Sequence, residues 1–215
     1  MKKNWFVEIL LSSIGKKLLM AITGFSFCLF LTAHLIGNLT LYGGKFFFLS
    51  YVTRLHSLGI IINIAEICLL FMAIVHIGMG CLLFYENTKA RPIKYAIKVS
   101  GGGRTIGSST MPYTGLFLFL FIIMHLFNFH FVDKGEKTIY KIVTDILSNP
   151  FYVAFYIFAM GVVAIHVSHG FWSVFQTLGL NHPKYMPLIK NIGIAFSIII
   201  GIGFGFIPIY ISLFA

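Results

Sequence analysis

The chain has 215 residues, of which 58% are hydrophobic and only 10% are charged, and its formal net charge is +10. A soluble domain of this size needs more polar surface than this composition supplies, so lipid must cover much of the protein. The composition excludes an ordinary soluble enzyme and predicts an integral membrane protein.

The N-terminal segment lacks the pattern of a secretory signal peptide. Its charged start is followed by a polar break at residues 12–17 and then by an apolar stretch too long for an h-region. Residues 5–14 instead predict a short amphipathic turn that lies in the membrane interface.

Five stretches are long enough to cross a membrane, which takes about 20 apolar residues. They are residues 17–42, 55–85, 112–132, 150–176 and 189–214. Of these, only the second has an acidic or basic residue, Glu66, in its apolar centre. The five spans occupy most of the chain. We therefore expect one all-α membrane domain over residues 1–215, a bundle of five transmembrane helices without a soluble catalytic domain.

Two connections between the spans have their own signals. Residues 86–112 are basic and rich in Gly and Ser, and Pro112 is expected to open the third span. Residues 132–150 predict a short amphipathic helix before Asn149-Pro150 opens the fourth span. The sequence contains no GxGxxG or GxxxxGK[ST] loop, which argues against nucleotide binding.

Lys and Arg are distributed unevenly between the two sides of the predicted bundle. With the N-terminus inside, the inner segments hold 11 of them and the outer loops hold five. This positive-inside bias predicts an inner N-terminus and an outer C-terminus. Basic inner segments attract anionic lipid or an acidic partner, so nucleic acid is not needed to explain the net charge. The expected contacts of a docked partner are Arg91, Lys94, Lys98 and Arg104.

The three cysteines do not form a metal-binding pattern. Cys28, Cys68 and Cys81 all lie within spans, at separations of 40 and 13 residues, and no CxxC pair occurs. This spacing argues against an iron–sulfur cluster or a zinc finger in this chain. We interpret the cysteines as small apolar residues of helices.

Each of the first four spans carries at least one histidine in its apolar part. An ionisable side chain inside a bilayer is costly and usually functional, although a single one can serve as a helix–helix hydrogen bond. With a rise of about 1.5 Å per residue, His34 and His125 lie roughly 26 and 18 Å outward from the inner ends of their spans. His76 and His166 lie roughly 30 and 22 Å inward from the outer side. The four histidines therefore form two pairs at two levels.

Two imidazoles at one level on different helices suit the two axial positions of a haem, and a bis-His iron suits electron transfer. We expect His34 and His125 to bind the iron of an outer haem, and His76 and His166 that of an inner haem. His169 shares a helix face with His166 and is the alternative ligand. A proton path would need more carboxylates than one, and zinc usually takes three or four protein ligands.

A second pattern accompanies the histidines. Gly24 and Gly115 each lie ten residues before the histidine of their span, near the inner haem's level, where a flat macrocycle needs backbone clearance. Helix packing is the alternative role for these glycines. The residues ten before the other two histidines are Glu66 and Tyr156, near the outer haem's level. Each is a candidate for binding a quinone or moving protons, and Tyr156 could equally fill space.

Four segments carry a resemblance to a known family: KKLLMAITG…FLTAHLIGNL, AEICLLFMAIVHIGMG with ENTKARP, TMPYTGLFLFLFIIMHL, and HVSHGFWSVFQTLGLNHPKY. In order and spacing they resemble the cytochrome b558 family, the five-helix, di-haem membrane anchors of succinate dehydrogenases and fumarate reductases. The resemblance covers nearly the whole chain. It implies that His34 and His125 ligate the distal haem and His76 and His166 the proximal one. It places the family's best-studied quinone carboxylate near the outer end of the second helix, whereas Glu66 lies deeper.

The resemblance also implies partners. A flavoprotein subunit and an iron–sulfur subunit would dock on the bacterial inner membrane, usually on its cytoplasmic face, and menaquinone would be the usual redox partner. This chain would be the electron-transferring subunit of the enzyme, because it offers no flavin site and no Arg/His cluster for a dicarboxylate. Fumarate reduction, succinate oxidation and a dimer of the whole complex are all compatible with the sequence. Two alternatives remain: the di-haem cytochrome b of a hydrogenase or nitrate reductase, and a haem-free transporter or channel.

Overall fold

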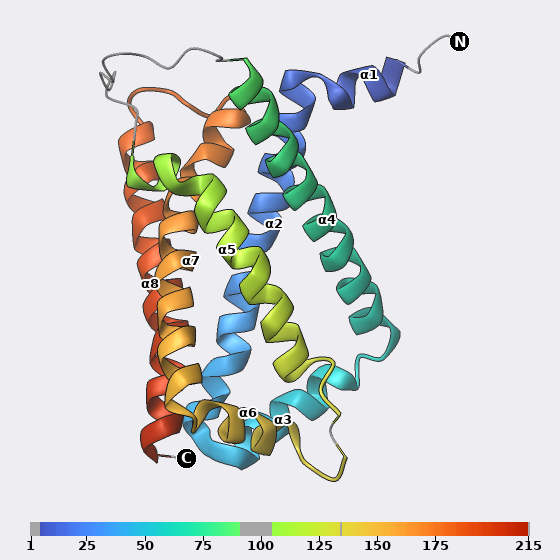
Figure 1. Ribbon diagram of the computed structural model, residues 1–215, viewed down its shortest axis with the longest axis vertical. Helices are drawn as coiled ribbons and strands as arrows, with labels where there is room; N and C mark the ends of the chain where they lie inside the picture. Colours follow the sequence, from blue (N-terminus) through green and yellow to red (C-terminus); the bar gives the residue numbers. More distant parts are fainter. Residues whose placement is uncertain (1–4, 91–104, 134, 215) are drawn as a thin grey trace.

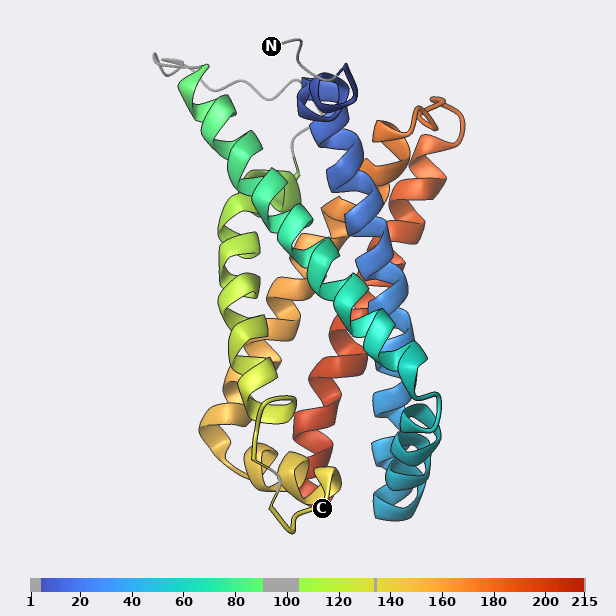
Figure 2. The same ribbon diagram turned by 90° about the vertical axis from the view of Figure 1, so that its right-hand side faces the viewer.

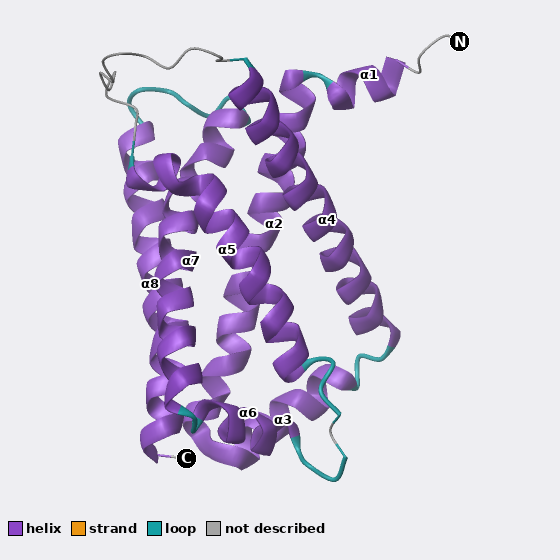
Figure 3. Cartoon of the chain, in the orientation of Figure 1, coloured by secondary structure: helices purple, strands orange, loops and turns teal. Residues whose placement is uncertain are grey.

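A computed structural model describes residues 5–90, 105–133 and 135–214 of the chain. Over these ranges the secondary structure is helical throughout, with no strand, which confirms the all-α prediction (Figure 3). The helices are α1 Trp5–Leu11, α2 Ser13–Leu39, the short 3-10 helix η1 Thr40–Gly43, α3 Gly44–His56, α4 Ile60–Lys89, α5 Ile106–Phe129, α6 Ile139–Leu147, α7 Pro150–Thr177 and α8 Met186–Phe214.

Five helical segments within the described ranges are long and apolar enough to cross a membrane. They are Ser13–His56, which comprises α2, η1 and α3, and the helices α4, α5, α7 and α8. Large apolar side chains cover their outward faces; Ile67 of α4, for example, is 67% exposed, and α4 has no buried residue. Such a surface is stable against lipid and not against water. The chain is therefore a multi-pass membrane protein, as its composition predicts.

The long helices run alternately up and down (Figures 1 and 2). One end of the bundle carries α1 and the connection from α7 to α8, and we call it the α1 end. The opposite end carries α3, α6 and the last turn of α8, and we call it the α6 end. α4 packs chiefly on α2 and crosses it at a slant (Figure 2).

The centre of the bundle is α7, which packs on α2, α5 and, most extensively, α8. Small residues let α7 and α8 approach each other closely, as is common between transmembrane helices. A methyl group on Gly201 would lie only 2.9 Å from Cβ of Ala164. Ala159 and Ile200 are fully buried at this interface.

An ion pair joins the first and second spans at the α1 end. Nζ of Lys16 lies 2.5 and 2.6 Å from the two carboxylate oxygens of Glu86. Lys16 is only 6% exposed, whereas the Glu86 side chain is partly open. The pair connects the start of α2 to the last turns of α4.

The boundaries of two spans differ from the sequence prediction. The third span begins at Ile106, so Pro112 lies inside α5 and does not open it. The reason is a capping box in which Thr105 Oγ1 accepts from the Ser108 N–H and Ser108 Oγ accepts from the Thr105 N–H. The second span begins at Ile60 and not at residue 55, because Gly59 turns the chain with a φ of +55°. Residues 44–56 form the separate helix α3, which the sequence analysis missed.

The starts of two other helices, α6 and α7, agree with the sequence prediction. The predicted short helix between the third and fourth spans is present as α6, with Thr138 as its N-cap. Asn149 caps α7 by accepting from the Phe151 N–H at 2.9 Å, and Pro150 occupies the first helical position. Near the N-terminus, residues 5–11 form α1, and Ser12 then caps α2.

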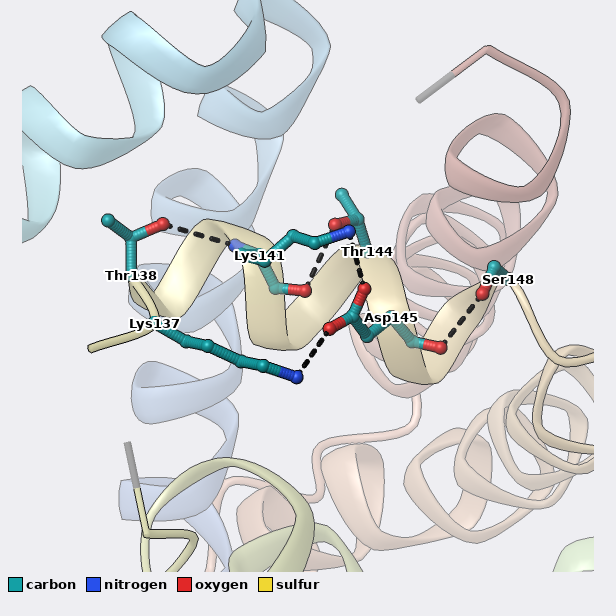
Figure 4. Close-up of polar contacts among 6 residues, drawn as sticks. All are labelled: Lys137, Thr138, Lys141, Thr144, Asp145 and Ser148. Atoms are coloured by element: carbon teal, nitrogen blue, oxygen red, sulfur yellow. Dashed lines mark hydrogen bonds and ion pairs between the residues drawn. The ribbon is translucent and has the colours of Figure 1, made fainter. Parts of the chain in front are cut away.

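Figure 4 shows the outward face of α6, where Asp145 lies between two lysines. Its carboxylate oxygens are 2.7 Å from Nζ of Lys141 and 3.0 Å from Nζ of Lys137. The hydrogen bonds from Lys141 and Lys137 stabilise the charged carboxylate, so the pKa of Asp145 is lowered from its ordinary value. The opposite face of α6 buries Ile142 and Leu147 in the bundle.

Because the folded-state pKa of Asp145 is lowered, its ion pairs stabilise α6 fully above the unfolded-state pKa of about 4, and this stabilisation is lost as the pH falls through the lowered folded-state pKa. We expect Asp145→Asn to increase amide hydrogen exchange in α6 modestly at pH 7. The difference from wild type should shrink as the pH falls through the lowered pKa, because the protonated carboxyl group is then neutral like the amide. Glu136→Gln, a change of the same kind in the same connection, is the control. Equal protection of wild type and Asp145→Asn at pH 7 would contradict this account.

Candidate functional site

His34 of α2 and His125 of α5 lie side by side toward the α6 end of the bundle. Their ring centroids are 6.0 Å apart and their ring planes are nearly perpendicular, at 88°. Phe30 stacks on His34, with ring centroids 5.2 Å apart. Phe121 and Phe129 pack against His125 at 5.8 and 5.1 Å. The two imidazoles therefore share an apolar, aromatic environment.

Tyr156 of α7 joins this cluster. It is only 6% exposed, and its ring centroid lies 6.1 Å from that of His125. Its hydroxyl oxygen accepts a hydrogen bond from the Asn128 amide at 3.0 Å. The helical spacing places Tyr156 at the level of the outer histidine pair, and the structure brings it into contact with one member of that pair.

His76 of α4 and His166 of α7 lie at the other level, toward the α1 end. Each has a threonine from a neighbouring helix beside its Nδ1 atom. Thr23 Oγ1 lies 3.0 Å from Nδ1 of His76, and Thr114 Oγ1 lies 3.0 Å from Nδ1 of His166. The structure thus brings His34 and His125 together, and it places His76 and His166 at the other level on two further helices.

Gly24 and Gly115 face the histidines of this second level. A methyl group on Gly24 would lie 3.3 Å from Cε1 of His76. The corresponding distance from Gly115 to Cε1 of His166 is 3.5 Å. Each glycine therefore lets an imidazole of the other helix lie directly against the backbone.

Glu66 and His169 are placed differently. Glu66 is exposed on the surface of α4. In the described part of the chain it has no hydrogen bond or ion pair. His169 contacts Trp172 edge-on, with ring centroids 4.8 Å apart, and lies against the backbone of Gly107. Its Nδ1 is buried without a hydrogen-bond partner in the structure. The expected docking residues Arg91, Lys94, Lys98 and Arg104 lie outside the described ranges.

The donor set of the two levels limits which metal group they can hold. Across the described residues, no three His, Cys, Asp or Glu side chains gather into one metal site. A metal ion bound by two imidazoles would therefore need further ligands from another molecule, such as the ring nitrogens of a porphyrin. A metal about 2 Å from a nitrogen of each ring would separate the ring centres by roughly 6 Å, which matches the spacing of His34 and His125. The spacing of His34 and His125 is thus compatible with a haem iron held between them.

Comparison with models of protein families, with curated proteins and with solved structures finds no match to this chain. A function is therefore inferred from the positions of the four histidines and their neighbours and from the resemblance of the sequence segments.

Sequence reasoning missed the two threonines that contact the inner histidines. Thr23 immediately precedes Gly24, and Thr114 immediately precedes Gly115, so α2 and α5 both contain the pattern TG-x9-H. This repeated pattern is the signal that could have identified them. A threonine in an apolar helix usually bonds the carbonyl one turn earlier, which hides any second role of its hydroxyl.

A leucine at Gly24 should displace His76, because its Cβ would already lie 3.3 Å from the ring. We expect Gly24→Leu and Gly115→Leu each to reduce the haem content of the purified protein to about half, as measured by the pyridine haemochromogen assay. Gly161→Leu is the control, because Gly161 is exposed on α7 and a methyl group there would meet nothing within 4 Å. Full haem content in both test variants would show that the glycines serve only helix packing.

Proposed function

We propose that this chain is the di-haem cytochrome b membrane anchor of a succinate:quinone oxidoreductase or quinol:fumarate reductase. The observation that carries the proposal is the placement of four imidazoles from four helices at two levels, with His34 and His125 6.0 Å apart at one level and a threonine beside each histidine at the other. The resemblance of the four segments to the cytochrome b558 family supplies the enzyme class.

His34 and His125 would hold one haem b, and His76 and His166 the other. When bound, the two haems would supply one-electron transfer between a soluble partner and a quinone. The protein would contribute two imidazoles to each iron, which would leave no ligand position open to oxygen. The aromatic side chains around His34 and His125 exclude water from that level.

The distribution of Lys and Arg orients the chain in our proposal. The α1 end faces the cytoplasm and the α6 end faces the outside, in the bacterial inner membrane. The flavoprotein and iron–sulfur subunits then dock at the α1 end. Lys16 is unsuited to contact them, because it is buried and paired with Glu86. Lys190 lies over the ring of Trp172 at 4.8 Å and belongs to the same end.

Menaquinone would react near the outer histidine pair. The Tyr156 oxygen already accepts from the Asn128 amide, so the phenolic proton remains available to a quinone oxygen. Tyr156 touches the ring of His125 and is thus close to the proposed outer haem ligand. Glu66, on the exposed face of α4, is the second candidate for proton transfer.

The first test is spectroscopic. We expect a reduced-minus-oxidised spectrum with b-type absorbance, two haems per chain, and co-purification with flavoprotein and iron–sulfur subunits. His34→Ala or His125→Ala should remove one haem, and His76→Ala or His166→Ala the other. His56→Ala, at the exposed end of α3, is the control and should retain both. Absence of b-type absorbance would favour a haem-free transporter or channel, and hydrogenase or nitrate reductase partners would favour that alternative.

The quinone assignment has its own test. Tyr156→Phe removes the phenolic proton but keeps the ring, so menaquinol-dependent turnover should fall by about 10²-fold with both haems retained. Tyr152→Phe, one turn away on the same helix, should leave turnover unchanged. Glu66→Gln measured in parallel separates the two candidates, since normal turnover in that variant excludes Glu66 from proton transfer.

A further inference from the structure

The two TG pairs hold the inner histidines in the same way. Thr23 and Gly24 of α2 lie against the Nδ1–Cε1 edge of His76, at 3.0 Å from Nδ1 and, for a methyl group on the glycine, 3.3 Å from Cε1. Thr114 of α5 and its glycine lie against the same edge of His166, at 3.0 and 3.5 Å. In both cases the dipeptide comes from a helix other than the one that carries the histidine.

The direction of each Thr–His hydrogen bond follows from the hydroxyl's single proton. The Thr23 hydroxyl donates to the Leu19 carbonyl at 2.7 Å, one turn earlier in α2. The Thr114 hydroxyl donates to the Thr110 carbonyl at 3.1 Å. Each threonine oxygen is therefore left to accept from the imidazole, which requires the ring proton to be on Nδ1. In that tautomer Nε2 carries the lone pair that a metal needs.

Burial protects these contacts from competition by water. Thr23 is 6% exposed and Thr114 is 9% exposed. A hydrogen bond between two sheltered partners fixes the rotation of the ring as well as its tautomer. With the Nδ1–Cε1 edge held against the TG backbone, each inner imidazole has one orientation.

The outer pair lacks this arrangement. Nδ1 of His125 is buried and has no hydrogen-bond partner in the structure. Within the described ranges, the only hydrogen-bonding group near the ring nitrogens of His34 is the Asn38 amide, at 3.4 and 3.5 Å, and that amide bonds the His34 carbonyl at 2.8 Å. Control of the tautomer by a neighbouring helix is thus confined to the inner level.

We propose that Thr23 and Thr114 are positioning residues that hold His76 and His166 with the proton on Nδ1 and Nε2 free to ligate iron. The inference deepens the proposed function and rests on it, since the metal in question is the iron of the inner haem. An acceptor on Nδ1–H raises the basicity of an imidazole ligand and favours the oxidised metal. The threonines therefore lower the reduction potential of the inner haem and strengthen its binding.

The test is a redox titration of the purified complex with Thr23→Val, Thr114→Val and both changes together. Valine keeps the shape of threonine but removes the hydroxyl acceptor, which leaves the Met20 carbonyl as the remaining acceptor at His76. We expect the potential of the inner haem, assigned as the one lost in His76→Ala, to shift to more positive values in each single variant and further in the double. The outer haem should not shift. Affinity for the inner haem should fall by about 10- to 100-fold in the double variant.

Two sets of controls separate this role from helix packing. Thr32→Val on α2 and Thr110→Val on α5 remove hydroxyls that bond carbonyls one turn earlier, at 2.9 Å in both cases, and both haem potentials should stay as in wild type. Thr23→Ser and Thr114→Ser keep the acceptor and should keep the wild-type potential. If the double variant does not accumulate, the single variants still test the proposal, because each should shift the inner haem's reduction potential to a more positive value.

The outcomes distinguish this inference from the proposed function. Wild-type protein without b haem contradicts the proposed function itself. Wild-type protein with two haems, together with an unchanged inner potential and unchanged inner haem affinity in the valine variants, contradicts only the role of the threonines. A shift of equal size in the control variants also contradicts it.

Discussion

The structure depends on one constraint: a polar group inside the bilayer has no water to bond and must find its partner in the protein. Several polar groups of the spans meet this constraint by contacting one another across helices. These contacts are Thr23 with His76, Thr114 with His166, and Asn128 with Tyr156. They join α2 to α4 and α5 to α7, so the contacts that hold the candidate site are also contacts that join the helices. Nδ1 of His125 is an exception, and it lies in the proposed outer ligand pair.

The site has an approximate internal repeat. α2 and α5 each contribute a TG pair to the level near the α1 end and a histidine to the other level. α4 and α7 each supply the histidine that rests on the TG pair. The repeat fails at the outer level, where Tyr156 is buried beside His125 and its counterpart Glu66 is exposed on α4. Tyr156 thus supplies a buried hydroxyl beside His125, which is the reason for preferring it to Glu66 in quinone chemistry.

Features of the fold and the site could be predicted from the sequence where a local or one-dimensional physical rule sets them. The five spans were predictable because lipid imposes a minimum apolar length, and the levels of the histidines because the helical rise is nearly constant. The start of α7 was predictable because Asn149-Pro150 is a local capping signal. The start of α5 was not predictable in this way. Its first turns are polar, so the apolar stretch that marks a span in the sequence begins only at Pro112. The contacts of Thr23 and the exposure of Glu66 depend on helix rotation, which the rise does not determine.

The rotation of α4 about its own axis is set by polar contacts. Apolar residues surround this helix on all sides and none of its residues is buried, so hydrophobicity gives it no preferred face toward the bundle. Two polar contacts with α2 supply that preference: Lys16 with Glu86, and Thr23 with His76. The two α4 residues are ten apart, or about 15 Å along the helix, so together they fix both its rotation and its position along α2. An ion pair that is half open, as this one is at Glu86, adds little net stability by itself, but it can select one register among several. Lys16 and Glu86 are therefore best understood as the contact that turns His76 toward the bundle.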